Sequence, residues 1–253
     1  VLSGVNLSVR PGEYVALAGP SGVGKTTLCS LIPRFYEVTG GSIKIDGTDI
    51  KDVTLKSLRD HIGVVQQDVY LFMGTIKENI RYGKPDATDE EVIQAAKLAN
   101  AHDFIMSFEN GYDTDIGQRG VKLSGGQKQR LAIARAIAKD PHIYVFDDSF
   151  SALDMKTDAR LRAALAEVTE NASVIIVAQR ISTIIHADQI LVLDDGKIVG
   201  KGTHEELLKN CDVYMQIAQS QLSAKELGLE NKETDIATDT SAISGLDNEK
   251  EGM

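Results

Sequence analysis

The clearest chemical signal in the sequence is a glycine-rich loop between a short apolar run and a helical pattern. The run YVALA at 14–18 leads into GPSGVGKT at 19–26, which opens the helical pattern KTTLCSLI. This order of strand, glycine loop and helix is the setting that the P-loop motif requires. The glycines let backbone N–H groups turn toward phosphate oxygens, and the helix N-terminus adds its positive end. A structural glycine turn is the alternative interpretation.

The loop carries the residue types that bind a nucleoside triphosphate together with Mg²⁺. Lys25 is placed to reach the β- and γ-phosphates, and Thr26 offers a hydroxyl to the metal. The predicted nucleotide-binding set runs continuously along the chain: Gly19, Pro20, Ser21, Gly22, Val23, Gly24, Lys25, Thr26 and Thr27.

Two carboxylates follow another strand-like run, HIYVFDD at 142–148. Asp147 and Asp148 come where this strand ends, and ligands bind at that edge of a parallel sheet. In P-loop enzymes an Asp at this place holds the Mg²⁺, directly or through water, and a following acidic residue orients or polarises the attacking water. We therefore assign Asp147 to the metal and Asp148 to catalysis. An Asp-Asp cap of the next helix is the alternative.

A third motif, LSGGQ at 123–127, directly precedes the helical pattern KQRLAIARAIAKD. A serine and two glycines at a helix N-terminus form a further anion site. With the P-loop and the paired aspartates, this motif resembles the nucleotide-binding domain of an ABC (ATP-binding cassette) transporter over about residues 1–222. The resemblance implies ATP as the nucleotide and a dimer, in which the partner's γ-phosphate is contacted by Leu123, Ser124, Gly125, Gly126 and Gln127.

Further positions follow from the resemblance. Gln67 in GVVQQDVYLF matches the Q-loop glutamine, which senses Mg²⁺ and couples to the membrane domain; Gln66 is the less favoured equivalent, because the family glutamine precedes the residue that is Asp68 here. The D-loop, which crosses between subunits, matches Ser151, Ala152, Leu153 and Asp154. The segments TDIGQRG at 114–120 and LFMGTIKENI at 71–80 resemble exporters, although Gln118 replaces the usual Glu.

Two positions depart from the family pattern in the same half-site. Asp148 stands where the family usually has Glu, and Gln179 stands where exporters usually have the switch His; none of the five histidines is at that place. A misplacement of ~1 Å can cost ~10²-fold in rate. We therefore expect this chain to resemble the degenerate-site subunit of heterodimeric bacterial multidrug exporters: it holds ATP, hydrolyses it slowly, and lends an intact signature to a partner. A homodimer in which Asp148 and Gln179 work tolerably is the alternative.

A third departure concerns adenine binding. Exporters stack adenine on an aromatic residue roughly thirty positions before the P-loop lysine, and that position would precede Val1. Tyr14 lies inside the strand that enters the P-loop, so we interpret it as a sheet residue. We expect the domain to be truncated within its first β-hairpin, with the membrane-spanning half of an exporter missing upstream.

Composition limits the class of protein. The 253 residues carry a net charge of −10, which argues against broad binding to nucleic acid. No run approaches the ~20 apolar residues of a membrane span, so we expect a soluble fragment. The two cysteines, Cys29 and Cys211, have no metal-ligand spacing and are predicted to be buried and reduced. Half of the net charge lies in residues 223–253, which contain no aromatic residue and are predicted to be a disordered acidic tail, either an interaction arm or a dispensable extension.

These motifs need an α/β scaffold to position them. Apolar runs at 14–18, 62–65, 143–146, 174–178 and 190–193 alternate with helical patterns, which predicts a mostly parallel sheet in the P-loop NTPase class. The sequence SIKIDG at 42–47 suits an antiparallel hairpin within a β subdomain. Residues from about 74 to 139 read as an all-helical insert, with a capping box at Thr88 and Glu91.

The sequence thus predicts an exporter motor domain at the cytoplasmic face of a cell membrane. Its expected partners are a second ABC domain, with a heterodimer favoured, and a transmembrane domain normally fused upstream. Two alternatives remain: a nucleotide-binding regulatory subunit with no turnover of its own, kept open by Asp148 and Gln179, and an ABC ATPase outside transport.

Overall fold

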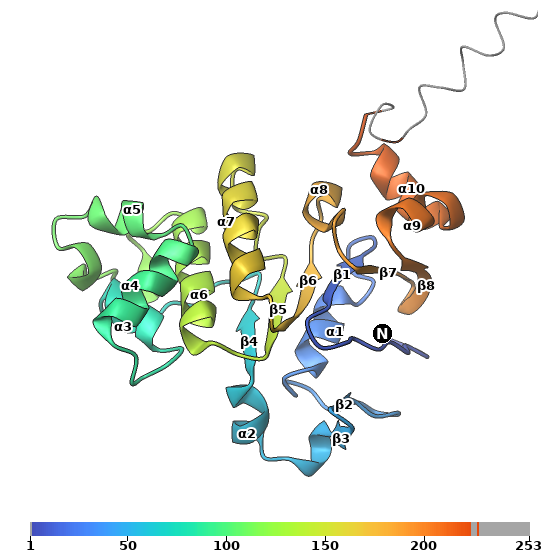
Figure 1. The fold of residues 1–253 in the computed structure, drawn as a ribbon, viewed down its shortest axis with the longest axis horizontal. Coiled ribbons are helices and arrows are strands. Elements are labelled where there is room, and N and C mark those ends of the chain that lie inside the picture. Colours follow the sequence, from blue (N-terminus) through green and yellow to red (C-terminus); the bar gives the residue numbers. More distant parts are fainter. Residues whose placement is uncertain (1, 224–226, 228–253) are drawn as a thin grey trace, which may run out of the picture.

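The fold is built on one twisted sheet, seen in a computed structural model that describes residues 2–223 and residue 227 (Figure 1). The strand order is β4-β5-β6-β1-β7-β8, with all neighbours parallel except the last pair. The strands are β1 (Tyr14–Ala18), β4 (Ile62–Val65), β5 (Ile143–Asp147), β6 (Ser173–Val177), β7 (Gln189–Asp194) and β8 (Lys197–Gly202). The predicted α/β class and the five apolar strands are confirmed. The sixth strand, β8, was not predicted, because its alternating and glycine-containing sequence lacks an apolar run.

Alternate strand residues build two separate cores, one on each face of the sheet. On one face, Val15 and Leu17 pack with Leu28 of α1 (Lys25–Leu31) and Leu58 of α2 (Leu55–Asp60). On the other, Ala16 packs within the cluster that includes the helices α6 (Gly125–Lys139), α7 (Met155–Val168), α8 (Ile181–Ile184), α9 (His204–Asn210) and α10 (Asp212–Gln219). The helix that follows the P-loop and the helix that follows the signature therefore lie on opposite faces.

Between β4 and β5 the described chain is helical. Figure 1 shows this segment beyond the β4 edge of the sheet, opposite the end that carries α9 and α10. Its helices are α3 (Ile76–Arg81), α4 (Asp89–Leu98), α5 (His102–Met106) and α6. The capping box predicted at Thr88 and Glu91 is confirmed, and a second one joins Thr75 to Glu78. Helices α4 and α5 are separate, because Asn100 between them adopts a left-handed conformation.

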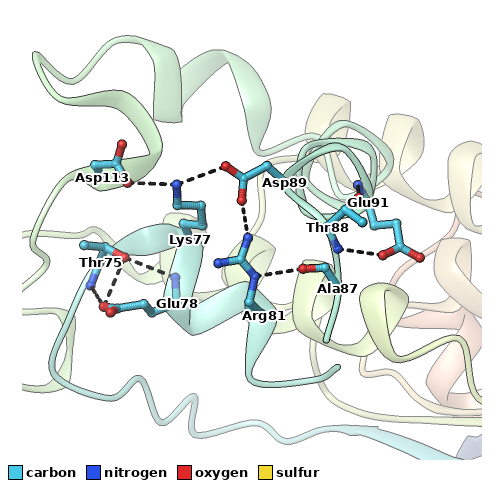
Figure 2. Close-up of polar contacts among 9 residues, drawn as sticks. All are labelled: Thr75, Lys77, Glu78, Arg81, Ala87, Thr88, Asp89, Glu91 and Asp113. Atoms are coloured by element: carbon cyan, nitrogen blue, oxygen red, sulfur yellow. Dashed lines mark hydrogen bonds and ion pairs between the residues drawn. The ribbon is translucent and has the colours of Figure 1, made fainter. Parts of the chain in front are cut away.

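A polar network ties the start of this helical segment together (Figure 2). Lys77 Nζ lies 3.2 Å from Asp89 Oδ2 and 3.1 Å from Asp113 Oδ1. Arg81 pairs with Asp89 and donates from Nε to the carbonyl of Ala87 at 3.0 Å. Solvent screens such exposed pairs, so their main effect is to set the relative orientation of α3 and α4 rather than to add much stability.

The predicted hairpin is present as a small sheet apart from the main one. Strands β2 (Lys44–Ile45) and β3 (Thr48–Asp49) pair antiparallel across Asp46 and Gly47. Both turn residues have positive φ, 49° and 80°, which is the conformation that an Asp-Gly hairpin turn requires. Both cysteines are buried and unpaired as predicted.

The C-terminal helices close the sheet beside β7 and β8. Tyr214 of α10 is fully buried, and its hydroxyl lies 2.8 Å from Nδ1 of His204 at the start of α9. Burial lowers the pKa of His204, which favours the neutral imidazole in this contact. The predicted acidic tail falls outside the described residues apart from Ser223 and Leu227.

Within the part of the chain that the structure describes, no helix combines the length and the apolar character needed to traverse a bilayer.

Candidate functional site

The glycine-rich loop turns tightly between β1 and α1. Gly19 has φ +137° and Gly24 has φ +107°, a region that side-chain-bearing residues rarely adopt. A Cβ at Gly19 would also lie 2.1 Å from the carbonyl oxygen of Leu193, so this position accepts only glycine. Lys25 folds over the loop, and its Nζ donates to the carbonyls of Gly19 at 2.7 Å and Pro20 at 2.6 Å. Burial lowers the pKa of Lys25, while Asp148 and Asp147 act in the opposite direction.

The loop meets the end of β5 through one hydrogen bond. Thr26 Oγ1 donates to Asp147 Oδ1 at 3.0 Å, although the two residues are 121 positions apart in sequence. Burial raises the pKa of Asp147, and the bond from Thr26 partly offsets this. A hydroxyl and a carboxylate that share one pocket are hard oxygen donors of the kind that Mg²⁺ prefers. The residues present therefore fit the metal assigned to them from the sequence.

A pocket of about 200 Å³ lies beside this pair. It is lined by Thr26, Cys29, Ser30, Phe35, Val64, Gln66, Gln67, Asp68 and Asp147. Gln66 and Gln67 follow β4 and are both exposed at this pocket, so the geometry does not distinguish between them as the Q-loop glutamine.

Asp148 and Gln179 form the second contact at this sheet edge. Gln179 Nε2 donates to Asp148 Oδ2 at 2.6 Å, and the backbone N–H of Asp148 donates to the carbonyl of Val177 at 3.0 Å. Asp148 has φ +48°, a left-handed conformation that Asp tolerates better than most residues. Burial raises the pKa of Asp148; the bond from Gln179 opposes this, and the charge of Asp147 adds to it. The two residues that depart from the family pattern are thus direct partners.

One residue at this edge was missed by the sequence analysis. Gln221, just after α10, donates from Nε2 to the carbonyl of Gln179 at 2.8 Å and accepts at Oε1 from the N–H of Ile181 at 2.8 Å. Nothing in the sequence marks it, because it follows an amphipathic helix and lies 42 residues from Gln179.

The signature motif begins α6 as a complete capping box. Ser124 Oγ accepts from the N–H of Gln127 at 3.3 Å, and Gln127 Oε1 accepts from the N–H of Ser124 at 2.9 Å. Leu123 is buried, whereas Ser124 and Gly125 are exposed. A Cβ at Gly126 would lie 3.2 Å from the carbonyl oxygen of Ala152, so the predicted D-loop packs against the signature.

The predicted D-loop connects Asp148 at the end of β5 to α7. Ser151 Oγ donates to the carbonyl of Asp148 at 3.0 Å, and Asp154 caps α7 by accepting from the N–H of Thr157 at 2.9 Å. Arg180 Nη1 donates to the carbonyl of Leu153 at 3.3 Å, which joins this loop to the segment after β6.

Apart from the predicted D-loop, which contacts both Asp148 and the signature, the predicted residues fall into two groups. The P-loop, both glutamines after β4, the paired aspartates and Gln179 share one sheet edge. The signature lies on the other face, and among residues 2–223 and 227 no hydrogen bond joins it to the P-loop. Within the described part of one chain, the two groups are therefore not joined by any hydrogen bond between the signature and the P-loop.

An aromatic patch lies on the surface near α3. It consists of Tyr70, Phe72, Met73 and Tyr82, all exposed. Arg135 of α6 holds it from beneath, donating to the carbonyls of Tyr70 at 3.0 Å and Asn79 at 2.9 Å, while its guanidinium lies 5.5 Å from the Phe72 ring centre. The segment Gln118–Gly120 forms a 3₁₀ turn beside the patch, with the Arg119 guanidinium 5.9 Å from the Tyr70 ring centre.

Comparison with known proteins agrees with this geometry. The sequence profile described as ABC transporter matches residues 2–151. The chain is 53% identical over 226 residues to ATP-binding cassette sub-family B member 6 of Xenopus tropicalis. It is 55% identical over 214 residues to a multidrug export ATP-binding/permease protein of Staphylococcus aureus strain NCTC 8325. The solved structure of a bacterial Atm1-family ABC exporter with ATP bound superposes with a TM-score of 0.85 at 44% identity.

The matches cover most of this chain but only part of each relative. They span 89%, 85% and 88% of the chain, against 27%, 37% and 39% of the three proteins in the same order. The chain therefore corresponds to about a quarter to two-fifths of the length of these relatives.

Proposed function

Because the chain belongs to the ABC transporter family, we propose that it is the nucleotide-binding domain of an ATP-driven exporter. The observation that carries the proposal is the contact of Thr26 with Asp147 beside Lys25, which joins the phosphate loop to the carboxylate edge of the sheet. The named functions of the relatives, multidrug export and Atm1-family export, support an export role over other transport directions.

Binding of ATP uses groups that the fold already aims at one place. Lys25 Nζ exchanges its carbonyl partners on Gly19 and Pro20 for phosphate oxygens, and the N–H groups at the start of α1 donate to the same phosphates. Thr26, Asp147 and Gln67 would hold Mg²⁺, which when bound neutralises phosphate charge.

Hydrolysis requires a water placed in line with the γ-phosphate. Asp148 accepts a hydrogen bond from that water and orients it, and Gln179 donates to the γ-phosphate through the amide hydrogen that Asp148 does not occupy. Asp148 is one methylene shorter than Glu, and Gln179 cannot become a cation as histidine can. We propose that this half-site turns over slowly for both reasons.

A second ABC domain completes each site. The signature of one chain meets the P-loop of the other, because within one chain they lie on opposite faces of the sheet. A heterodimer is the favoured assembly: the weak residues fall in this chain's own nucleotide half-site, whereas Leu123 to Gln127 carry no substitution from LSGGQ.

The aromatic patch supports coupling to a membrane domain. Tyr70 and Phe72 lie within a few residues of Gln67 along the chain, and the relatives are much longer proteins, one of them named an ATP-binding/permease protein. We propose that transmembrane helices of the exporter dock on the patch and receive motion through the loop around Gln67. The working location is then the cytoplasmic face of the cell membrane.

The test compares ATPase activity of the chain alone and mixed with an ABC domain that has Glu and His at the two positions. We expect the ATPase activity of the mixture to be well above the sum of the activities of the two separate components. Robust turnover by the chain alone that is lost in Asp148→Asn contradicts the weak-site proposal and favours a homodimer.

A regulatory subunit is the second candidate, favoured specifically by the Asp148 and Gln179 pair. Such a subunit binds ATP and closes the dimer without turning over its own nucleotide. Asp148→Asn distinguishes it in a mixture whose partner domain is inactivated by Glu→Gln. Slow residual turnover that the substitution removes belongs to this half-site, whereas no residual turnover with or without the substitution means that this half-site only regulates.

The domain limits are part of the proposal. Residues 1–222 form one ABC domain whose helical insert spans about 74–139, and 223–253 are an appended acidic tail. Deleting 223–253 is expected to leave ATP affinity unchanged, as measured by calorimetry. A loss of binding contradicts these limits.

A further inference from the structure

The segment that follows β6 is held from the C-terminal end of the described chain. Gln221 makes two hydrogen bonds of 2.8 Å, one to the carbonyl of Gln179 and one from the N–H of Ile181. These two backbone groups flank Arg180. The single side-chain amide of Gln221 therefore pairs with one carbonyl and one N–H of the main chain, as the backbone of a neighbouring parallel strand would. Only one orientation of the amide satisfies both bonds, because its oxygen must accept and its nitrogen must donate.

This contact replaces a missing helix cap. Arg180, at the N-cap of α8, supplies no side-chain hydrogen bond to the helix. The N–H of Ile181 is left without an intrahelical partner, and Ile181 is buried. The other long-range bonds to α8 involve carbonyls of its body: Tyr14 Oη donates to that of Thr183, and Arg162 Nη1 to that of Ser182. Gln221 therefore supplies the acceptor that the N-cap side chain of α8 does not.

Gln221 is itself well anchored. The backbone N–H of Gln221 and that of Leu222 both donate to the carbonyl of Ala218, at 3.0 and 2.8 Å, which closes the end of α10. Ala218 and Tyr214 of α10 are completely buried. The Gln221 amide therefore fixes the loop at Gln179 and Arg180 relative to the packed helix α10.

The loop position decides what Gln179 can reach. Its side chain spans 2.6 Å to Asp148 Oδ2, and its own backbone is held by Gln221. Arg180 in the same loop adds a longer contact, 3.3 Å, from its Nη1 to the carbonyl of Leu153, and its own carbonyl accepts from the N–H of Thr183 at 3.1 Å. A chain of hydrogen bonds therefore connects Gln221 at the end of α10 through Gln179 to Asp148.

We propose that Gln221 is a positioning residue of the ATPase site, which holds the backbone of Gln179 so that its amide meets Asp148 and the γ-phosphate. This inference rests on the proposed function, since it assigns a role in the same turnover. It also makes α10 a point from which the C-terminal part of the chain controls hydrolysis: moving α10 releases the loop without touching the P-loop.

The test uses the full chain with Gln221→Met and Gln221→Ala. Met keeps the length and apolar stem but removes both hydrogen bonds, so it separates the bonds from packing. Gln219→Ala is the matched control, because Gln219 is exposed and makes no side-chain hydrogen bond to any described residue. Each variant is mixed with the partner ABC domain that carries Glu and His, itself made inactive by Glu→Gln, so that turnover reports this half-site.

Two readouts are needed. The two hydrogen bonds of Gln221 to Gln179 and Ile181 are called the clamp. Hydrogen–deuterium exchange of the peptide containing Ile181 tests whether the clamp forms, independently of ATPase activity. Loss of one hydrogen bond is expected to speed exchange about fivefold in both Gln221 variants. Steady-state kinetics read the consequence: kcat is expected to fall about tenfold, as for a small displacement of a reacting group, with KM for ATP within about twofold of wild type. Gln219→Ala should match wild type in both.

Each outcome decides the inference. Unchanged exchange means that the clamp does not exist, and faster exchange with unchanged kcat means that it does not position Gln179; either overturns the proposal. A loss of kcat in Gln221→Ala but not in Gln221→Met assigns the effect to packing and overturns it too. If the wild-type chain binds ATP but shows no turnover with the inactivated partner domain, the proposed slow hydrolysis fails together with this inference. The absence of turnover in the wild-type measurement itself identifies that case.

Discussion

Two helices of this protein begin at glycine-rich loops, and their first turns differ in how the N–H groups are satisfied. Helix α1 follows Gly24, which has left-handed geometry and offers no side chain; the first turn contains no acidic residue. Helix α6 follows Ser124, whose hydroxyl and the amide of Gln127 satisfy two N–H groups reciprocally. The first helix end is left open to a ligand, and the second is stable without one.

Under the proposed function, this difference would let one chain carry two kinds of half-site. Under the proposed function, the N–H groups at the open end of α1 bind phosphate, so we expect a single chain to bind ATP without a partner. The capped end at α6 keeps its shape before a partner arrives. Ser124 Oγ accepts the bond from Gln127, which leaves its own O–H free to donate to a phosphate from another subunit.

The largest expected effect is at the open end. Lys25→Ala removes the cation over the loop, and we expect MgATP affinity to fall by about 10- to 100-fold, as when a charged hydrogen-bond partner is lost. Isothermal titration calorimetry on the isolated chain measures this. Lys56→Ala, an exposed lysine that pairs with Asp60, is the control and should bind as wild type does. Unchanged affinity in Lys25→Ala would remove the basis for treating α1 as the nucleotide end.

The next effect concerns the carboxylate beside that end. Asp148→Glu restores the missing methylene and is expected to raise turnover of this half-site about tenfold, because geometry at a reacting centre strongly controls rate. The measurement is steady-state ATPase with the inactive partner domain, and Asp52→Glu is the matched control. If turnover stays at the wild-type level, carboxylate reach is not what weakens the site, and Gln179 becomes the remaining explanation.

At the capped end we expect two smaller and separable effects. Ser124→Ala removes the N-cap and should lower the free energy of unfolding by about 1 kcal/mol, while ATP affinity of the isolated chain stays the same. Thr88→Ala removes the equivalent cap from α4 and should cost a similar amount in denaturant titrations. Only Ser124→Ala should also reduce turnover in the partner's site. Equal behaviour of the two variants would mean that the signature serine is a cap and nothing more.

The smallest effect is expected in the network of Figure 2. Lys77→Ala removes both ion pairs that lead from α3 to Asp89 and Asp113. Because solvent screens these charges, we expect little change in melting temperature and none in ATP affinity. A marked loss of partner-stimulated turnover in this variant would show that the orientation of the helical segment matters to the signature end.

The sequence predicted those parts of the fold and the candidate site whose information is local. The P-loop needs glycines at the positive-φ positions 19, 22 and 24, the capping box at Thr88 needs Glu91 three positions later, and the strands are short apolar runs. Each of these patterns lies within about ten residues of sequence. The pairing of Asp148 with Gln179 and the clamp by Gln221 depend on how β5, β6 and α10 pack, which no local pattern encodes. Strand β8 was missed for the same reason, since its pairing with β7 decides its conformation.

The placement of the two helix ends on opposite faces of the sheet also has a kinetic consequence. If every ATP site joins the open end of one chain to the capped end of another, turnover at low concentration rises with the product of two chain concentrations. Dilution alone then switches hydrolysis off in the free chain. Attachment to a shared membrane domain would replace that dependence with a fixed effective concentration, so the same residues would work at any expression level.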